Sequence, residues 1–211
     1  MNAQTLKLEL AGPSGVLQGL RDAASVPGGG APRGVAVIAH PHPLFGGTMD
    51  NKVVQTLARA FVQSGWDAVR FNFRGVGASA GAWDEGRGEI DDFLAVLAQQ
   101  APHGLIAIAG FSFGAYVASH ALKAVCSSRE VVQAVLVGTA ASRFQVAELA
   151  PELHDRALVL HGEQDDTVPL SAVMDWARPQ ALPVTVVPGG GHFFHGQLPL
   201  LKALVMRHLR S

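Results

Sequence analysis

The stretch Leu105-Ile-Ala-Ile-Ala-Gly110-Phe-Ser112-Phe-Gly114-Ala-Tyr-Val-Ala-Ser-His120 decides the fold of this chain. Its apolar first part predicts a buried strand and its last part predicts a helix, with a tight turn at Ser112. Glycines stand two residues before and two residues after the serine, where a sharp turn leaves room only for very small residues. This context is typical of a nucleophile elbow, which raises the hydroxyl above the sheet. An ordinary strand-to-helix turn with a capping serine is the alternative.

Length and composition are consistent with one well-filled core. The chain has 211 residues, of which 48% are hydrophobic and only 16% are charged. Such a balance suits an α/β protein whose central strands are covered on both faces. A second domain is not required at this length, so we expect a single domain over residues 1–211.

The net charge indicates which binding partners to expect, and the cysteine content indicates the cellular location. The formal net charge is −1 and no long basic run occurs, so we expect neither nucleic acid nor a membrane surface as a partner. No apolar run approaches the ~20 residues of a membrane-spanning helix, and Met1–Leu10 alternates polar and apolar residues. Cys126 is the only cysteine, which excludes an internal disulfide and favours a cytoplasmic location. No pattern indicates the oligomeric state.

Segments of strand and helix character alternate along the chain. Residues 6–10 and 16–21, separated by Gly12-Pro-Ser-Gly15, predict an antiparallel hairpin. Further strands are predicted at 35–39, 67–73, 131–137, 157–160 and 184–187, and helices at about 51–64, 89–99, 171–181 and 198–209. This alternation predicts an α/β fold with a mostly parallel sheet, right-handed crossovers and helices on both faces.

Two later segments supply partners for the serine. A serine hydroxyl is a poor nucleophile unless a base takes its proton and a third group orients that base. The predicted strand at 157–160 leads into a loop with Asp165 and Asp166, and the strand at 184–187 leads into a loop with His192 and His195. Such groups gather beyond the carboxyl ends of parallel strands, and the order Ser, Asp, His is that of an α/β-hydrolase triad.

Several motifs resemble those of the α/β-hydrolase superfamily. They are Gly162-x-x-Asp165-x-x-Val168-Pro169, the Gly191-His192-Phe-Phe segment and the Arg74-Gly75-Val-Gly77-Ala-Ser79 turn. The loop His40-Pro-His-Pro-Leu-Phe-Gly-Gly-Thr-Met-Asp-Asn51 is similar to that of small, lidless members related to dienelactone hydrolases and serine-aminopeptidase-like hydrolases. The resemblance runs from about Val35 to the C-terminus and implies an α/β-hydrolase fold without a cap domain.

The resemblance also assigns the catalytic candidates. Asp165 takes the position of the family's acid, whereas Asp166 is interpreted as a solvated carboxylate or a helix cap. His192 matches the histidine motif and follows three glycines, and His195 is the runner-up. We interpret His161, at a strand end, as a satisfied buried imidazole. Dienelactone hydrolases use a cysteine nucleophile, so their particular reaction is not carried over to Ser112.

Stabilising an oxyanion requires two backbone N–H donors. One is the residue after the nucleophile, Phe113, and the other comes from the loop after the first parallel strand. The prolines of that loop have no N–H. By resemblance to lidless relatives we favour His42, with Leu44 as the second choice.

No cofactor is expected. The pair His40-x-His42 could suggest a metal, but no third ligand with suitable spacing is apparent. The glycines at 75, 77 and 81 do not match a dinucleotide-binding pattern, because the third comes one residue late and no helix begins there. Arg74 is interpreted as a structural anchor of its loop.

The predicted function is that of a serine hydrolase with an acyl-enzyme intermediate. Only about Thr139 to Arg156 separates two predicted strands at the place where relatives carry a lid, which predicts an open, shallow pocket. Small or short-chain carboxylic esters or thioesters are the expected substrates, and Phe45, Phe193, Trp83, Phe111 and Phe113 are candidates for an apolar wall or for core. An acyltransferase or lyase, a peptidase, and a non-catalytic binding protein are the alternatives.

Overall fold

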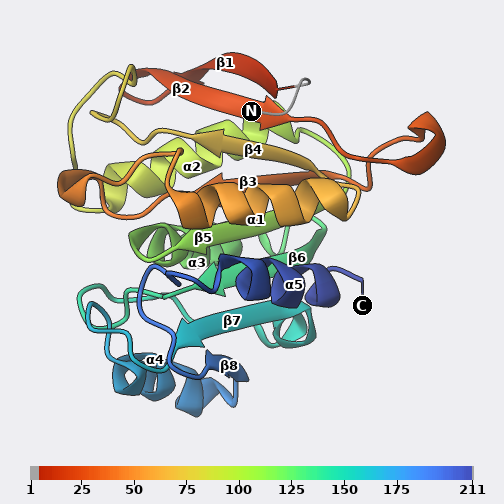
Figure 1. Ribbon diagram of the computed structural model, residues 1–211. Helices are drawn as coiled ribbons and strands as arrows, with labels where there is room; N and C mark the ends of the chain where they lie inside the picture. Colours follow the sequence, from red (N-terminus) through yellow and green to blue (C-terminus); the bar gives the residue numbers. More distant parts are fainter. Residues whose placement is uncertain (1–4, 211) are drawn as a thin grey trace.

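An eight-stranded sheet with helices on both faces forms the frame of the molecule (Figure 1). The computed structural model describes residues 5–210. The strands are β1 (Thr5–Gly12), β2 (Gly15–Asp22), β3 (Val35–Ala39), β4 (Asp67–Phe71), β5 (Ile106–Phe111), β6 (Val131–Val137), β7 (Ala157–Gly162) and β8 (Val184–Val187). The helices are α1 (Lys52–Gln63), α2 (Arg87–Gln100), α3 (Phe113–Val125), α4 (Leu170–Ala177) and α5 (Leu198–His208).

The strand order is β1-β2-β4-β3-β5-β6-β7-β8. β1 and β2 form an antiparallel hairpin in register from Thr5↔Asp22 to Gly12↔Gly15, and β2 pairs antiparallel with β4. Every other pairing is parallel. The structure therefore confirms the predicted mostly parallel sheet with an N-terminal antiparallel hairpin.

The helices form two layers that bury both faces of the sheet. In Figure 1, α1 and α5 lie in front of the sheet, whereas α2 and α3 lie behind it. Side chains alternate between the faces along each strand: in β5, Ile106 and Ile108 join the core under α2, α3 and α4, and Ala107 and Ala109 join the core under α1 and α5. Because both faces are covered, the central strands are apolar throughout.

Some element ends differ from the prediction. β4 stops at Phe71, two residues earlier than expected, because the chain turns away into the loop that carries Arg74. The helix expected at 171–181 ends at Ala177 and continues as a short 3₁₀ turn at Arg178–Gln180. Pro179 has no N–H to donate to the preceding turn of the helix, which explains the early end.

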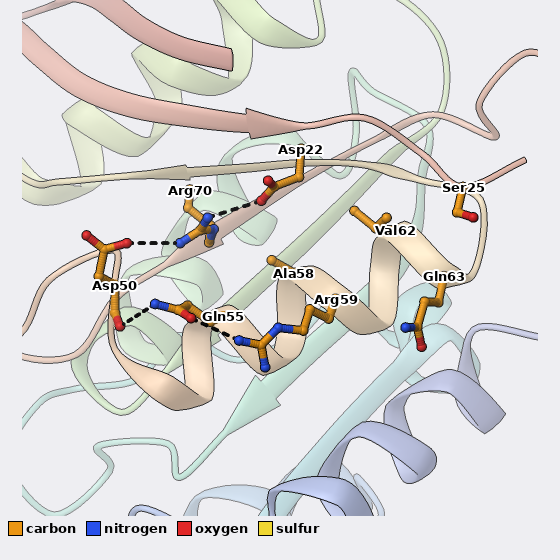
Figure 2. Close-up of a pocket in the computed structure, with 9 residues that line it drawn as sticks. All are labelled: Asp22, Ser25, Asp50, Gln55, Ala58, Arg59, Val62, Gln63 and Arg70. Carbon is orange, nitrogen blue, oxygen red and sulfur yellow. Dashed lines mark hydrogen bonds and ion pairs between the residues drawn. The ribbon is translucent and has the colours of Figure 1, made fainter. Parts of the chain in front are cut away.

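Arg70 of β4 ties the hairpin to the start of α1. Its buried guanidinium donates to Asp22 (3.1 Å), to the carbonyl of Met49 (2.9 Å) and to Asp50 (3.3 Å). These groups line a hollow of about 420 Å³ along α1, where Arg59 donates to Gln55 (3.0 Å; Figure 2). Arg70 is therefore engaged with Asp22 and Asp50, and Arg59 is engaged with the neutral side chain of Gln55.

Within residues 5–210, no helix combines the length and the apolar character needed to cross a bilayer.

Candidate active site

Ser112 occupies a strained turn between β5 and α3. Its backbone has φ 58° and ψ −117°, a conformation that a residue with a side chain rarely adopts. A Cβ at Gly110 would lie 2.1 Å from the carbonyl oxygen of Gly114, and a Cβ at Gly114 would lie 2.4 Å from that of Ala39. The two glycines are therefore required by close backbone contacts, as the sequence pattern predicted.

Asp165 lies in the loop after β7. Its Oδ1 accepts hydrogen bonds from the backbone N–H groups of Thr167 (2.9 Å) and Val168 (2.7 Å). These bonds orient the second carboxylate oxygen, Oδ2, toward the loop after β8. The two loops approach closely because Gly162 has no Cβ, which would lie 2.3 Å from the carbonyl oxygen of Gly190.

His192 joins the two other side chains. Its Nδ1 lies 2.6 Å from Asp165 Oδ2 and its Nε2 lies 2.9 Å from Ser112 Oγ. The ring packs against Phe111, with centroids 5.0 Å apart. All three polar side chains are buried. With Nδ1–H donating to the carboxylate, Nε2 is left to accept the proton of the serine hydroxyl.

The electrostatics of Asp165 favour this tautomer. Burial by itself raises the pKa of the carboxyl group, but hydrogen bonds from His192 and from the N–H of Val168 outweigh it and hold the pKa below the usual range. The carboxylate is therefore ionised at neutral pH. An ionised acceptor keeps the proton of His192 on Nδ1.

The alternative residues lie elsewhere. Asp166 is exposed, and within residues 5–210 its side chain accepts only from Thr167. His195 is exposed, with its ring centroid 5.9 Å from that of Phe193. His161 is buried, as predicted, and its Nε2–H donates to the carbonyl of Val168 (2.9 Å). Its Nδ1 has no partner within residues 5–210, so the prediction of a fully satisfied imidazole was wrong.

Two backbone N–H groups are available near the serine. The loop after β3 forms a 3₁₀ turn, Pro43–Phe45, in which the N–H of Leu44 donates to Nδ1 of His42 (3.2 Å). The N–H groups of His42 and Phe113 have no acceptor in the described part of the chain. Leu44 is thus already engaged, which favours His42 over it as the second donor.

A hollow of about 370 Å³ opens above Ser112 and His192. Phe45 and Phe193 line it and are 75% and 43% exposed. Phe111 and Phe113 belong to the core, and Trp83 packs against His42, with ring centroids 4.5 Å apart. Of the five candidates for an apolar wall, two therefore border the hollow.

Comparisons with known proteins agree with this geometry. A family model described as X-Pro dipeptidyl-peptidase (S15 family) matches residues 24–148. An uncharacterised protein of Rickettsia prowazekii is 32% identical over 197 residues, which cover 87% of this chain and 79% of that protein. A crystal structure from Xanthomonas campestris, described as an α/β serine hydrolase without a lid, is 35% identical, with a TM-score of 0.87 and coverage of 100% of this chain and 95% of the other.

The chain belongs to the S15 family. It is one of the small α/β-hydrolase superfamily members without a lid. A similar structure, an α/β serine hydrolase homologue from Coxiella burnetii, is 37% identical, with a TM-score of 0.79 and coverage of 99% and 98%. The fold class predicted from the sequence is thereby confirmed.

One residue of this hydrolase's hollow was missed by sequence reasoning. Arg143 lies in the loop after β6, where the lid of larger relatives was expected, and it lines the hollow with Ser112. Nothing in the local sequence marks it, since it is a single arginine in an irregular segment. Its approach to Ser112 depends on how the loop folds back over α3.

Two other predicted residues have structural partners. Arg74 donates to Asp92 of α2 through Nε (3.0 Å) and Nη2 (2.8 Å), which confirms it as the anchor of its loop. Nδ1–H of His40 donates to the carbonyl of Pro41 (2.6 Å), and Nε2 accepts from the N–H of Phe73 (3.1 Å). Both ring nitrogens of His40 are therefore engaged by the backbone.

Proposed function

We propose that this protein is a serine hydrolase that cleaves small or short-chain carboxylic esters or thioesters. The proposal is carried by the unbroken chain of hydrogen bonds from Ser112 through His192 to Asp165, at 2.9 and 2.6 Å. In it Ser112 is the nucleophile, His192 the general base and acid, and Asp165 the group that orients the imidazole.

The mechanism begins with proton transfer from Ser112 Oγ to His192 Nε2 as Oγ attacks the acyl carbonyl. The N–H groups of Phe113 and His42 would donate to the oxyanion of the tetrahedral intermediate. Phe113 is the first residue of α3, so the positive end of the helix dipole also stabilises that charge. These donors match what the developing negative charge requires.

Collapse of the intermediate breaks the bond to the alkoxide or thiolate leaving group, which takes its proton from His192. The acyl group remains on Ser112 Oγ. Water then loses a proton to His192 Nε2 and attacks the acyl-enzyme, and collapse of the second intermediate releases the carboxylic acid and restores the hydroxyl. Asp165 remains ionised throughout.

The shape of the hollow supports short substrates. Its rim is formed by exposed side chains such as Phe45, and Arg143 of the loop after β6 also lines it. A long acyl chain would extend past this rim into water. The site can bury a few methylene groups of an acyl chain against Phe45 and Phe193.

A peptidase is the second candidate, because the matching family model is that of a dipeptidyl-peptidase. The substrate of such an enzyme carries an ammonium group close to the scissile bond. The charged residue at the rim of the hollow is Arg143, and no aspartate or glutamate lines it. This charge distribution favours esters over peptides with a free N-terminus.

A fluorophosphonate probe followed by an ester panel tests the proposal. We expect labelling on Ser112, located by mass spectrometry, and turnover of p-nitrophenyl esters that falls as the acyl chain grows from two to twelve carbons. An X-Pro p-nitroanilide tested alongside should be cleaved far more slowly. Absence of labelling would point to a binding protein, and faster anilide cleavage would establish the peptidase. Faster transfer to added alcohol than to water would indicate an acyltransferase.

A further inference from the structure

Arg143 supplies an unpaired positive charge to the hollow that holds Ser112. We propose that it selects substrates bearing a carboxylate a few atoms from the scissile carbonyl, an inference that rests on the proposed hydrolase function.

The backbone of Arg143 is held in place by the loop that follows β6. The N–H groups of Arg143 (3.2 Å) and Phe144 (3.1 Å) both donate to the carbonyl of Ala140. The Phe144 ring stacks on Tyr116 of α3, with centroids 4.9 Å apart, and contacts Phe113 at 5.2 Å. The aromatic anchor fixes the loop on α3, so the adjacent Arg143 side chain lines the hollow.

The guanidinium of Arg143 makes no ion pair or hydrogen bond within residues 5–210. By contrast, Arg21, Arg70 and Arg74 each pair with an aspartate. No aspartate or glutamate lines the hollow above Ser112. The charge is therefore left without a counter-ion from the residues around it.

Two features near Arg143 bear on the charge of the hollow. Burial lowers the pKa of His42, and the nearby Arg143 lowers it further, so the imidazole is neutral at pH 7 and does not supply a competing cation. The N-terminus of α3 directs the positive end of its dipole at Ser112. Among the described residues that line the hollow, Arg143 is thus the one lysine or arginine, and the helix dipole acts in the same direction as its charge.

A carboxylate is the group that this arrangement suits best. The planar guanidinium presents paired N–H donors that match the two oxygens of a carboxylate. Arg143 is exposed, so water screens the attraction, and we expect a preference of about fivefold to tenfold. The carboxylate could belong to the acyl part or to the leaving group of the ester, and the two arms of the test separate these sources.

In the first arm, p-nitrophenyl hydrogen adipate is compared with its methyl ester, which places the charge in the acyl part. In the second arm, the butyrate ester of 4-hydroxybenzoate is compared with that of methyl 4-hydroxybenzoate, which places it in the leaving group. The measured quantity is the ratio of kcat/KM for the anionic ester to that for the neutral ester, after subtraction of spontaneous hydrolysis. Each ratio is compared between wild type and Arg143→Gln, which cancels the intrinsic reactivity of the esters.

We expect the ratio in at least one arm to fall about fivefold to tenfold in Arg143→Gln and further in Arg143→Glu. The wild-type ratio should also fall as ionic strength rises, because the attraction is screened. Arg207→Gln is the matched control, since it removes the same charge from the exposed C-terminal end of α5 and should leave the ratio unchanged.

Ratios that stay unchanged in both arms, with turnover that still depends on Ser112, would overturn this inference and leave the hydrolase proposal standing. Loss of turnover in Ser112→Ala separates genuine catalysis from background. If the wild type hydrolyses none of the four esters, the proposed function fails and this inference fails with it.

Discussion

Two hollows of this molecule hold similar kinds of residues and use them in opposite ways. The larger one lies along α1, where Arg70 is engaged by Asp22, Asp50 and a backbone carbonyl (Figure 2). The smaller one lies above Ser112 and is lined by Arg143, whose guanidinium has no partner within residues 5–210. It lies beside a strained backbone turn and beside the N–H groups of His42 and Phe113, which have no acceptor in the same range.

The comparison shows that the volume of a hollow does not indicate where chemistry takes place. Around Arg70, the Nη1 and Nη2 groups join β2, β4 and the start of α1, and Nε has no partner within residues 5–210. Around Ser112, hydrogen bonds connect Asp165 to His192 and His192 to the serine hydroxyl, which faces the hollow. A substrate can bind to hydrogen-bonding groups that the fold leaves without a partner.

The largest expected difference between the two regions comes from Ser112→Ala. We expect kcat for a short p-nitrophenyl ester to fall at least about 10⁴-fold, because removal of the nucleophile disables the triad as a unit. The free energy of unfolding should change by less than about 1 kcal/mol. Steady-state kinetics and denaturant unfolding of the same preparation check both parts. Residual activity near that of the wild type would remove Ser112 from its role.

Replacing Asp165 tests the other end of the hydrogen-bonded series that begins at Ser112. Asp165→Asn should lower kcat by about 10⁴-fold, because an amide no longer stabilises the correct tautomer of His192. Asp166→Asn is the matched control and should stay within about twofold, since its side chain is exposed and away from His192. Equal effects of the two substitutions would mean that the acid has been assigned to the wrong carboxylate.

The region around Arg70 should respond in stability and not in catalysis. Arg70→Met leaves Asp22 without its buried partner, and we expect the free energy of unfolding to fall by about 3–5 kcal/mol. Removing both charges in Arg70→Met/Asp22→Leu should restore part of it. Urea unfolding measures the loss, and kcat/KM per folded molecule should stay within about twofold. A loss of kcat per folded molecule in Arg70→Met would contradict the distinction between a stabilising region around Arg70 and a catalytic region around Ser112.

The response to acid at the sheet edge that carries Ser112 is the most gradual of the expected effects. Burial lowers the pKa of His40 to about 4, although its hydrogen bond to the carbonyl of Pro41 acts in the opposite direction. The unfolded chain binds this proton near pH 6.5 and the folded chain does not. Stability is therefore complete above pH 6.5 and falls by about 1.4 kcal/mol per pH unit between 6.5 and 4.

Unfolding measured from pH 7 to pH 4.5, together with an NMR titration of the His40 ring, checks this prediction. His161, whose pKa is also lowered by burial, contributes with the same sign. A free energy of unfolding that does not change between pH 6.5 and 5 would contradict it.

Much of the fold and of the triad could be predicted from sequence, because both depend on local rules. The glycines around Ser112 are required by sterics within a few residues of the turn, and the apolar runs of the strands reflect a sheet covered on both faces. Asp165 and His192 follow strands that end at the same edge, and the resemblance to α/β-hydrolase motifs selected them over Asp166 and His195.

By itself, then, the sequence determined the elbow through contacts between near neighbours, the parallel sheet through the alternation of strand and helix patterns, and the candidates for the triad through motifs that resemble those of a known superfamily. Only the tertiary structure decided that Arg143 lines the same hollow as Ser112, that the N–H of His42 has no acceptor within residues 5–210, and that Arg70 bridges Asp22, Asp50 and the carbonyl of Met49. These features depend on contacts between segments far apart in the sequence. No local pattern encodes such contacts, because the partners meet only when the helices and loops have packed on the sheet.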